Sequence, residues 1–151
     1  MTQKVSSILV GVSGEYFVAA ELSRRGYIAS ITLRNTQGID IVATNESGKK
    51  SVNIQVKTKS KGSWWLLSKK AEEVKDKNIF YVFVELNKID ELPLFYIVPS
   101  RDVAKRVSEG HKKWLETPGK KGQQRNDSNM RAWRDEENKY LNKWELLKLD
   151  S

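Results

Sequence analysis

The sequence predicts an α/β domain in which a β-sheet is flanked by helices. Apolar residues recur at helical spacing over residues 13–25 and 100–115. Short runs that are rich in β-branched and aromatic residues and bounded by turn residues predict strands at residues 27–33, 39–44, 52–58, 63–67, 79–86 and 93–98. Because 151 residues is the size of one domain with a substantial core, we expect residues 1–151 to form a single unit.

The first helix is predicted to begin after Ser13, a suitable N-cap, and to end at Gly26, a suitable C-cap. Glu15 has helical spacing with Ala19 and Leu22, so it should point towards the buried side of this helix or its margin. A carboxylate in that position suggests a functional role. The alternative is a first-turn glutamate that only interacts favourably with the helix dipole.

A β-hairpin follows the first strand. Residues 34–38 predict a turn that leads to Asp40. The alternating runs 39–44 and 52–58 are separated by the turn-forming segment NESGKK, which favours an antiparallel pair. This hairpin contains the residues that constrain the function most.

Three polar side chains of the hairpin are expected to lie close together. Side chains alternate between the faces of a strand, so Gln55 and Lys57 share one face and the hairpin can bring Asp40 near them. An aspartate, an amide and a lysine in this arrangement can hold a divalent cation beside a phosphate. The alternative is a polar stripe that faces solvent on an ordinary hairpin.

The middle of the chain completes the predicted sheet. In the short strand 63–67, Trp64 and Trp65 should face opposite ways, so that one joins the core. The other either stacks on a nucleic-acid base or packs under the next segment. That segment, residues 68–75, predicts a short helix or irregular structure, and Ser100 is the expected N-cap of the second long helix.

The C-terminal third contains two further predicted features. Residues 117–126 form a basic loop without acidic residues, either an arm that binds phosphates or simply a solvated loop. Residues 128–149 are rich in aromatic residues and leucine, and they predict a helical segment. This segment should dock on the domain or on a second subunit, with Trp133, Tyr140, Trp144 and Leu147 as candidate contacts.

The charge of the chain favours a polyanionic partner. Lysine and arginine number 27 against 19 acidic residues, for a net charge of +8. No acidic residue occurs between Glu46 and Glu72, although seven lysines fall there. The positive charge is therefore concentrated around the hairpin. The alternative is that the charge only keeps the protein soluble, as it does in many basic proteins.

Composition excludes several classes of site and of protein. Without cysteine, the chain has no disulfide, thiol nucleophile or cysteine zinc site, and its only histidine is His111. No run resembles a signal peptide or is long enough for a membrane span. We therefore expect a soluble, cytoplasmic protein that does not associate with membranes and whose chemistry depends on carboxylates, lysines and a metal.

The sequence Gly38-Ile39-Asp40, followed by the IQVK run that ends at Lys57, resembles the motif of the PD-(D/E)XK nuclease superfamily. It has the variant in which glutamine occupies the (D/E) position, as in Mrr-type restriction enzymes and homing endonucleases of bacterial group I introns. Archaeal Holliday junction resolvases are more distantly similar. The resemblance covers about residues 11–100 and places Glu15 where many members carry a glutamate on the first helix.

This resemblance implies a restriction endonuclease-like core with a mixed four- to five-stranded sheet flanked by helices, to which the chain adds the C-terminal helical extension. It implies an endonuclease that hydrolyses DNA with Mg²⁺, for which Mn²⁺ can substitute. Asp40, Gln55 and the backbone carbonyl of Val56 would hold the metal. Lys57 would orient the attacking water, and Glu15 would bind a water of the metal shell. Relative to the family, residues 68–75 are short for the second helix.

DNA is the expected partner, and the side chains predicted to contact it are Lys49, Lys50, Lys59, Lys61, Lys69, Lys70, Lys120, Lys121 and Arg125. One site of this kind cuts one strand, so cleavage of a duplex calls for a homodimer or homotetramer. Two alternatives stay open: a nucleic-acid-binding module of the same fold without catalytic activity, and a nuclease that acts on RNA.

Overall fold

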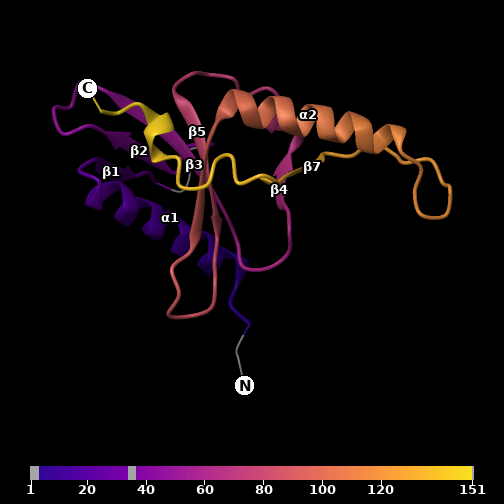
Figure 1. The fold of residues 1–151 in the computed structure, drawn as a ribbon, viewed down its shortest axis with the longest axis horizontal. Coiled ribbons are helices and arrows are strands. Elements are labelled where there is room, and N and C mark those ends of the chain that lie inside the picture. The colour runs from indigo at the N-terminus through magenta and orange to yellow at the C-terminus, as the bar shows by residue number, and fades with distance from the viewer. Residues whose placement is uncertain (1–3, 34–36, 151) are drawn as a thin grey trace.

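A mixed five-stranded sheet with the strand order β1-β2-β3-β5-β6 forms the centre of the fold (Figure 1). Its strands are β1 (Ile28–Ile31), β2 (Ile41–Thr44), β3 (Ser51–Lys59), β5 (Ile79–Glu85) and β6 (Leu94–Pro99). Strands β3 and β5 pair in parallel, and the other neighbours are antiparallel. The computed structural model describes residues 4–33 and 37–150, so residues 34–36 of the predicted turn lie outside the described part.

Helix α1 (Ser7–Arg24) begins earlier than the sequence predicts. Ser6 is the N-cap, since its side chain accepts a hydrogen bond from a backbone N–H of the first turn. The hydroxyl of Ser13 instead donates to the carbonyl of Val10 at 2.7 Å, so Ser13 lies within the helix. Glu15 is consequently in the middle of α1, which removes the alternative of a first-turn glutamate at the helix dipole.

Helix α1 packs closely on one face of the sheet. Val18 and Leu22 are fully buried, and a Cβ at Gly14 would collide with the side chain of Thr58 on β3. The helix ends at Arg24 with Arg25 as its C-cap, one residue before the predicted C-cap Gly26, whose φ of +89° favours glycine. The contact between Gly14 and Thr58 places the middle of α1 next to the end of β3.

Helix α2 (Ser100–Glu116) covers the opposite face of the sheet, where Val103 and Val107 are buried against aromatic rings of β5 and β6 (Figure 1). Ser100 is not the N-cap that the sequence predicts. It is buried as the first residue of the helix, and its hydroxyl donates to the carbonyl of Asp76 at 2.8 Å. The serine therefore joins α2 to the loop before β5.

The prediction of a helical segment over residues 128–149 is wrong. Strand β7 (Met130–Trp133) pairs antiparallel with β4 (Trp65–Ser68) as a two-stranded ribbon, and the only helical turn after β7 in the described chain is the 3₁₀ helix η2 (Trp144–Leu147). Burial alternates along β7 with the period of a strand. Asn138 and Asn142 have positive φ, a conformation that interrupts helices.

The C-terminal aromatic residues dock within the chain, which was the alternative to an oligomer interface. Trp133, Trp144 and Leu147 are only 1%, 5% and 2% exposed to solvent. The hydroxyl of Tyr140 donates to Asp102 on α2 at 2.8 Å. Trp133, Trp144 and Leu147 are therefore buried within one chain, and Tyr140 is partly buried.

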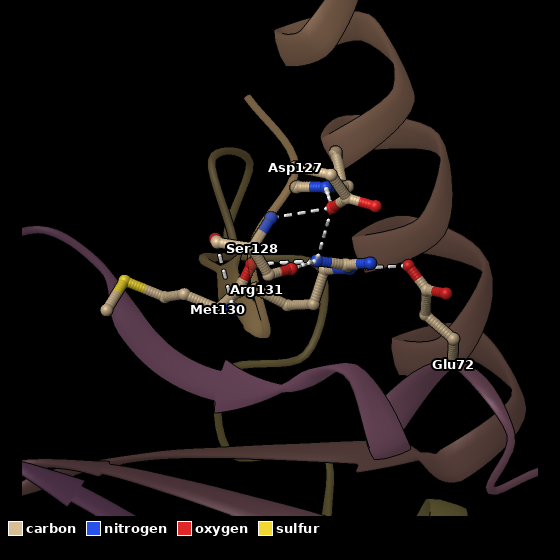
Figure 2. A network of polar contacts seen from close by, with 6 residues as sticks. Glu72, Asp127, Ser128, Met130 and Arg131 are labelled. Carbon is tan, nitrogen blue, oxygen red and sulfur yellow. Dashed lines mark hydrogen bonds and ion pairs between the residues drawn. The ribbon is translucent and has the colours of Figure 1, made fainter. Parts of the chain in front are cut away.

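A buried arginine fixes the ribbon to the rest of the domain (Figure 2). The side chain of Arg131 is 3% exposed, and its Nε donates to Glu72 at 2.6 Å. Glu72 ends the 3₁₀ helix η1 (Lys69–Glu72). The Nη1 group of Arg131 donates to the carbonyls of Ser128 and Met130 and lies 3.7 Å from Asp127. The ion pair thus joins β7 to η1.

Replacing Arg131 with alanine is expected to lower the free energy of unfolding by about 3–5 kcal/mol, because removal of one partner leaves Glu72 without its buried counter-charge. Arg134→Ala is the matched control, since its pair with Glu136 is largely exposed and should contribute less than about 1 kcal/mol. Urea titration of both variants measures the difference. Equal midpoints would show that the buried pair does not stabilise the ribbon.

Candidate active site

Asp40 is held against strand β3 at the point where β2 begins. Its carboxylate Oδ2 accepts a hydrogen bond from the N–H of Val56 at 2.7 Å, and its own N–H donates to the carbonyl of Ile54 at 2.9 Å. Its carbonyl accepts from the N–H of Thr32, also at 2.9 Å. The structure therefore places Asp40 beside the residue that lies between Gln55 and Lys57.

The carbonyl of Val56 faces the same edge of β3 as the carboxylate of Asp40, because the N–H and C=O of one strand residue point to the same side. The pairing of β2 with β3 begins at Ile41 and Ile54. Asp40 directly precedes Ile41, so it lies beside β3 just outside the paired part of β2. The edge of β3 thus presents a carboxylate and a backbone carbonyl together.

Gln55 and Lys57 line a hollow of about 520 Å³ on the face of the sheet opposite α1. Ser68, Lys70 and Tyr81 also line it, so β4, η1 and β5 contribute as well as β3. Burial raises the pKa of the Tyr81 hydroxyl, which keeps this group protonated and able to donate a hydrogen bond. The hollow therefore combines two ammonium groups with neutral polar groups, an arrangement that suits an anionic ligand.

The donor set near Asp40 fits a hard divalent cation. A carboxylate, a backbone carbonyl and the amide oxygen of Gln55 are the oxygen ligands that Mg²⁺ accepts, and Mg²⁺ usually keeps several waters in addition. No group of three His, Cys, Asp or Glu residues placed to hold a metal occurs within residues 4–33 and 37–150. With Asp40 as its main negative charge, the site should bind a cation weakly on its own.

Glu15 is less directly connected to this site. It is partly buried on α1, directly after Gly14, which contacts the residue following Lys57. Gln55 and Lys57 line the hollow, but Glu15 and Asp40 are not among the described residues that line it. Glu15 thus lies on the helix turn that covers the end of β3, and Asp40 lies at the edge of that strand.

Lys59, one of the predicted DNA contacts, is held by partners within the chain. Its side chain is 9% exposed, and its Nζ lies 2.8 Å from Glu85 and 2.6 Å from the carbonyl of Gly62. The same ammonium lies 4.3 Å from the centre of the Trp65 ring. Alternation along β3 puts Lys59 on the same face as Lys57, but the parallel pairing with β5 supplies Glu85 as its partner.

Lys49 and Lys50 lie away from the hollow at Gln55. Together with Lys77 and Lys148 they surround a second hollow of about 450 Å³ near the start of β3, whereas Lys57 is near its end. None of these four lysines forms an ion pair within the described part of the chain. The structure therefore separates Lys49 and Lys50 from Lys70, which lines the first hollow.

The basic loop 117–126 lies at the far end of α2, away from the sheet (Figure 1). Lys120 and Lys121 are exposed there. Arg125 fastens the loop, because its Nε donates to the carbonyl of Thr117 at 2.9 Å and its guanidinium stacks over Trp114 at 4.7 Å. Arg125 therefore has a structural role that the sequence did not indicate.

The two adjacent tryptophans lie in different environments. Trp65 is the tryptophan that joins the core, at 4% exposure, and Trp64 is 44% exposed beneath the guanidinium of Arg134. Lys61 and Lys69 are exposed in the segments that follow β3 and β4.

No helix among the described residues is both long and apolar enough to cross a membrane. No protein-family profile and no curated protein sequence matches the chain.

Among solved structures, the chain is similar to the bacterial homing endonuclease I-Ssp6803I, with a TM-score of 0.56 and 16% identity over 96% of this chain and 94% of that chain. It is also similar to Hjc, a Holliday junction resolvase of Archaeoglobus fulgidus, with a TM-score of 0.48 and 15% identity over 83% and 84% of the two chains. The first likeness confirms the predicted fold: the chain has the fold of restriction endonuclease-like nucleases.

Proposed function

We propose that this protein is a metal-dependent endonuclease that hydrolyses phosphodiester bonds in DNA. The observation that carries the proposal is the position of Asp40, whose carboxylate is held against Val56 between Gln55 and Lys57. A nuclease-type fold, a hollow lined by lysines and a net charge of +8 support the same function.

Each residue of the site has a defined part in this proposal. Asp40, the carbonyl of Val56 and the amide oxygen of Gln55 would hold Mg²⁺, or Mn²⁺ in its place. The cation, when bound, would polarise the phosphate and increase the acidity of a water. Lys57 places its ammonium where it orients the attacking water and stabilises the charge that develops on the phosphate. Glu15 positions a water at the margin of the site.

The glutamine in this site affects how the metal is held. Gln55 supplies a neutral oxygen where a carboxylate would add a negative charge, so Asp40 alone attracts the cation strongly. A phosphate oxygen of the bound DNA then becomes a necessary further ligand. Metal binding and DNA binding should therefore strengthen each other.

DNA is the proposed partner. Its proposed phosphate contacts are Lys70, which lines the hollow, Lys69 beside it, and Lys61 in the segment that follows β3. Lys49 and Lys50 would contact phosphates farther along the strand, and Lys120 and Lys121 would do so only if the DNA extends along α2. Because one site cuts one strand, we propose a homodimer or homotetramer as the form that cuts both.

The second candidate is a nucleic-acid-binding module without catalytic activity. It is favoured by the glutamine at position 55 and by the lack of an acidic cluster among the described residues. Incubation of supercoiled plasmid with Mg²⁺, Mn²⁺ or a chelator separates the two. The endonuclease nicks or linearises the plasmid only with metal, whereas the binding module retards it in chelator and never cuts it.

Removing positive charge near the hollow should weaken the salt dependence of DNA binding. The double variant Lys61→Gln with Lys70→Gln is expected to reduce the slope of log affinity against log salt by roughly one to two units, since each lost phosphate contact removes about 0.9. Lys120→Gln with Lys121→Gln removes the same charge far from the hollow and should change the slope less. An unchanged slope in the first variant would contradict the proposed DNA surface.

A further inference from the structure

Helix α1 exposes a large apolar surface on the side that does not contact the sheet. Ile8, Leu9 and Tyr16 are 66%, 60% and 63% exposed. Beside the helix, Ile31 at the end of β1 and Leu33 just after it are 44% and 79% exposed. We call these five residues the α1 face. Apolar side chains this exposed and this numerous on neighbouring elements mark a binding surface rather than scattered surface residues.

Helical geometry shows that the α1 face is separate from the buried side of the helix. An advance of about 100° per residue places Ile8, Leu9 and Tyr16 within about one third of the circumference. Leu9 and Tyr16 lie about 160–180° around the helix from the buried Val18, and Ile8 lies between them and the buried Leu22. Packing on the sheet needs only one apolar side of the helix, and within the described chain the second apolar side stays largely exposed.

The charge pattern indicates which kind of partner fits this face. No charged residue occurs between Lys4 and Glu15, although the chain as a whole carries a net charge of +8. A phosphate backbone would not be attracted to this uncharged surface. Two copies of the chain repel each other over most of their surfaces, and at an uncharged apolar face that repulsion is weakest.

We infer that the α1 face binds a second copy of this chain through a two-fold symmetric contact. In such a contact each α1 packs its exposed apolar side against the α1 of the partner, and Ile31 and Leu33 enlarge the buried area. The same uncharged apolar patch serves on both subunits, as a two-fold interface requires. The core of such an interface is typically apolar and depleted of charge.

This interface would connect the two active sites. Gly14 of α1 is in direct contact with Thr58, the residue after Lys57. Pairing through α1 would therefore hold the ends of both β3 strands in a fixed relation. The value of that relation for cutting both strands of a duplex rests on the proposed nuclease function, but the dimer itself does not.

Light scattering on the purified chain at micromolar concentration tests the interface. The wild type should have at least twice the chain mass of 17.4 kDa. Leu9→Lys with Tyr16→Lys should weaken association at least about 100-fold, because it buries like charges in the contact. Ile89→Lys with Leu92→Lys is the matched control, since these residues are 88% and 71% exposed but lie in the loop between β5 and β6.

Circular dichroism and urea titration must show that all three proteins are equally folded, which the exposure of the altered residues predicts. Since the chain has no cysteine, Leu9→Cys and Tyr16→Cys, made singly, give a second readout. At least one should form a disulfide-linked dimer under conditions in which Ile89→Cys stays monomeric.

A monomeric wild type at all concentrations would overturn the inference, as would unchanged association in the Leu9→Lys with Tyr16→Lys variant. Retention of a monomeric wild type by lipid vesicles would likewise overturn it and would assign the face to a membrane surface. A monomeric wild type that cuts DNA would contradict the interface and leave the proposed function intact. A dimer through this face that never cuts DNA would support the interface and contradict the proposed function.

Discussion

Replacing Asp40 with asparagine is expected to lower the rate of DNA cleavage by at least about 1,000-fold while leaving the fold intact. Asparagine has nearly the same shape, and its amide oxygen can still accept the hydrogen bond that Val56 donates to Asp40 at 2.7 Å. The substitution therefore removes the negative charge and little else. Because Asp40 is the main charge available to the cation in this site, the effect on cleavage should be large.

Single-turnover cleavage of supercoiled plasmid, with protein in excess, measures this loss. Asp90→Asn is the matched control, because Asp90 lies in the exposed loop between β5 and β6 and asparagine tolerates its positive φ. Urea titration should give similar stability for wild type and both variants. If Asp40→Asn cut DNA at nearly the rate of the wild type, the catalytic assignment of Asp40 would be wrong.

Replacing Lys57 with alanine is expected to slow cleavage by about 100- to 1,000-fold without abolishing metal binding. The side chain of Lys57 lines the hollow beside Gln55, on the face opposite the buried side chain of Val56. Its ammonium supplies no ligand to a cation but stabilises negative charge on the phosphate. Asp40 and Lys57 should therefore differ in their effects on metal affinity.

Calorimetric titration with Ca²⁺ in the presence of duplex DNA measures that difference. Lys88→Ala controls for the loss of one positive charge, because Lys88 is exposed in the loop between β5 and β6. Lys57→Ala and Lys88→Ala should both retain metal binding, but only Lys57→Ala should lose most of the cleavage rate. Loss of the metal site in Lys57→Ala would show that the roles of Asp40 and Lys57 are not separate.

The hairpin of β2 and β3 could be predicted because its signals are local. Alternation with a period of two and the NESGKK turn are both contained within residues 39–58. The faces of Gln55, Lys57 and Val56 follow from the same alternation. The proximity of Asp40 to this pair was therefore available from the sequence, and the hydrogen bond to Val56 gives its exact position.

Contacts between distant segments could not be predicted in the same way. The parallel register of β3 and β5 pairs Lys59 with Glu85, and no local pattern indicates that partner. Ser68, Lys70 and Tyr81 reach the hollow through the same long-range packing. The sequence therefore predicted the residues at the edge of β3 better than the walls of the hollow.

The C-terminal segment shows how composition misleads where periodicity is weak. Its aromatic residues and leucines predict a helical segment, yet they occupy β7, an irregular stretch and η2. These residues are nevertheless buried: Trp133 packs on one face of the sheet and Trp144 packs on the other. Buried apolar residues alone do not specify which secondary structure carries them.

The most direct test of the proposed site is the binding of Mn²⁺, followed by electron paramagnetic resonance, in the presence of a duplex that cannot be cleaved. The wild type should bind one Mn²⁺ per chain, and more tightly with the duplex than without it. Asp40→Asn should lose this binding under the same conditions, and Lys57→Ala should keep it. Equal Mn²⁺ binding by the wild type and Asp40→Asn would contradict a metal site at the edge of β3.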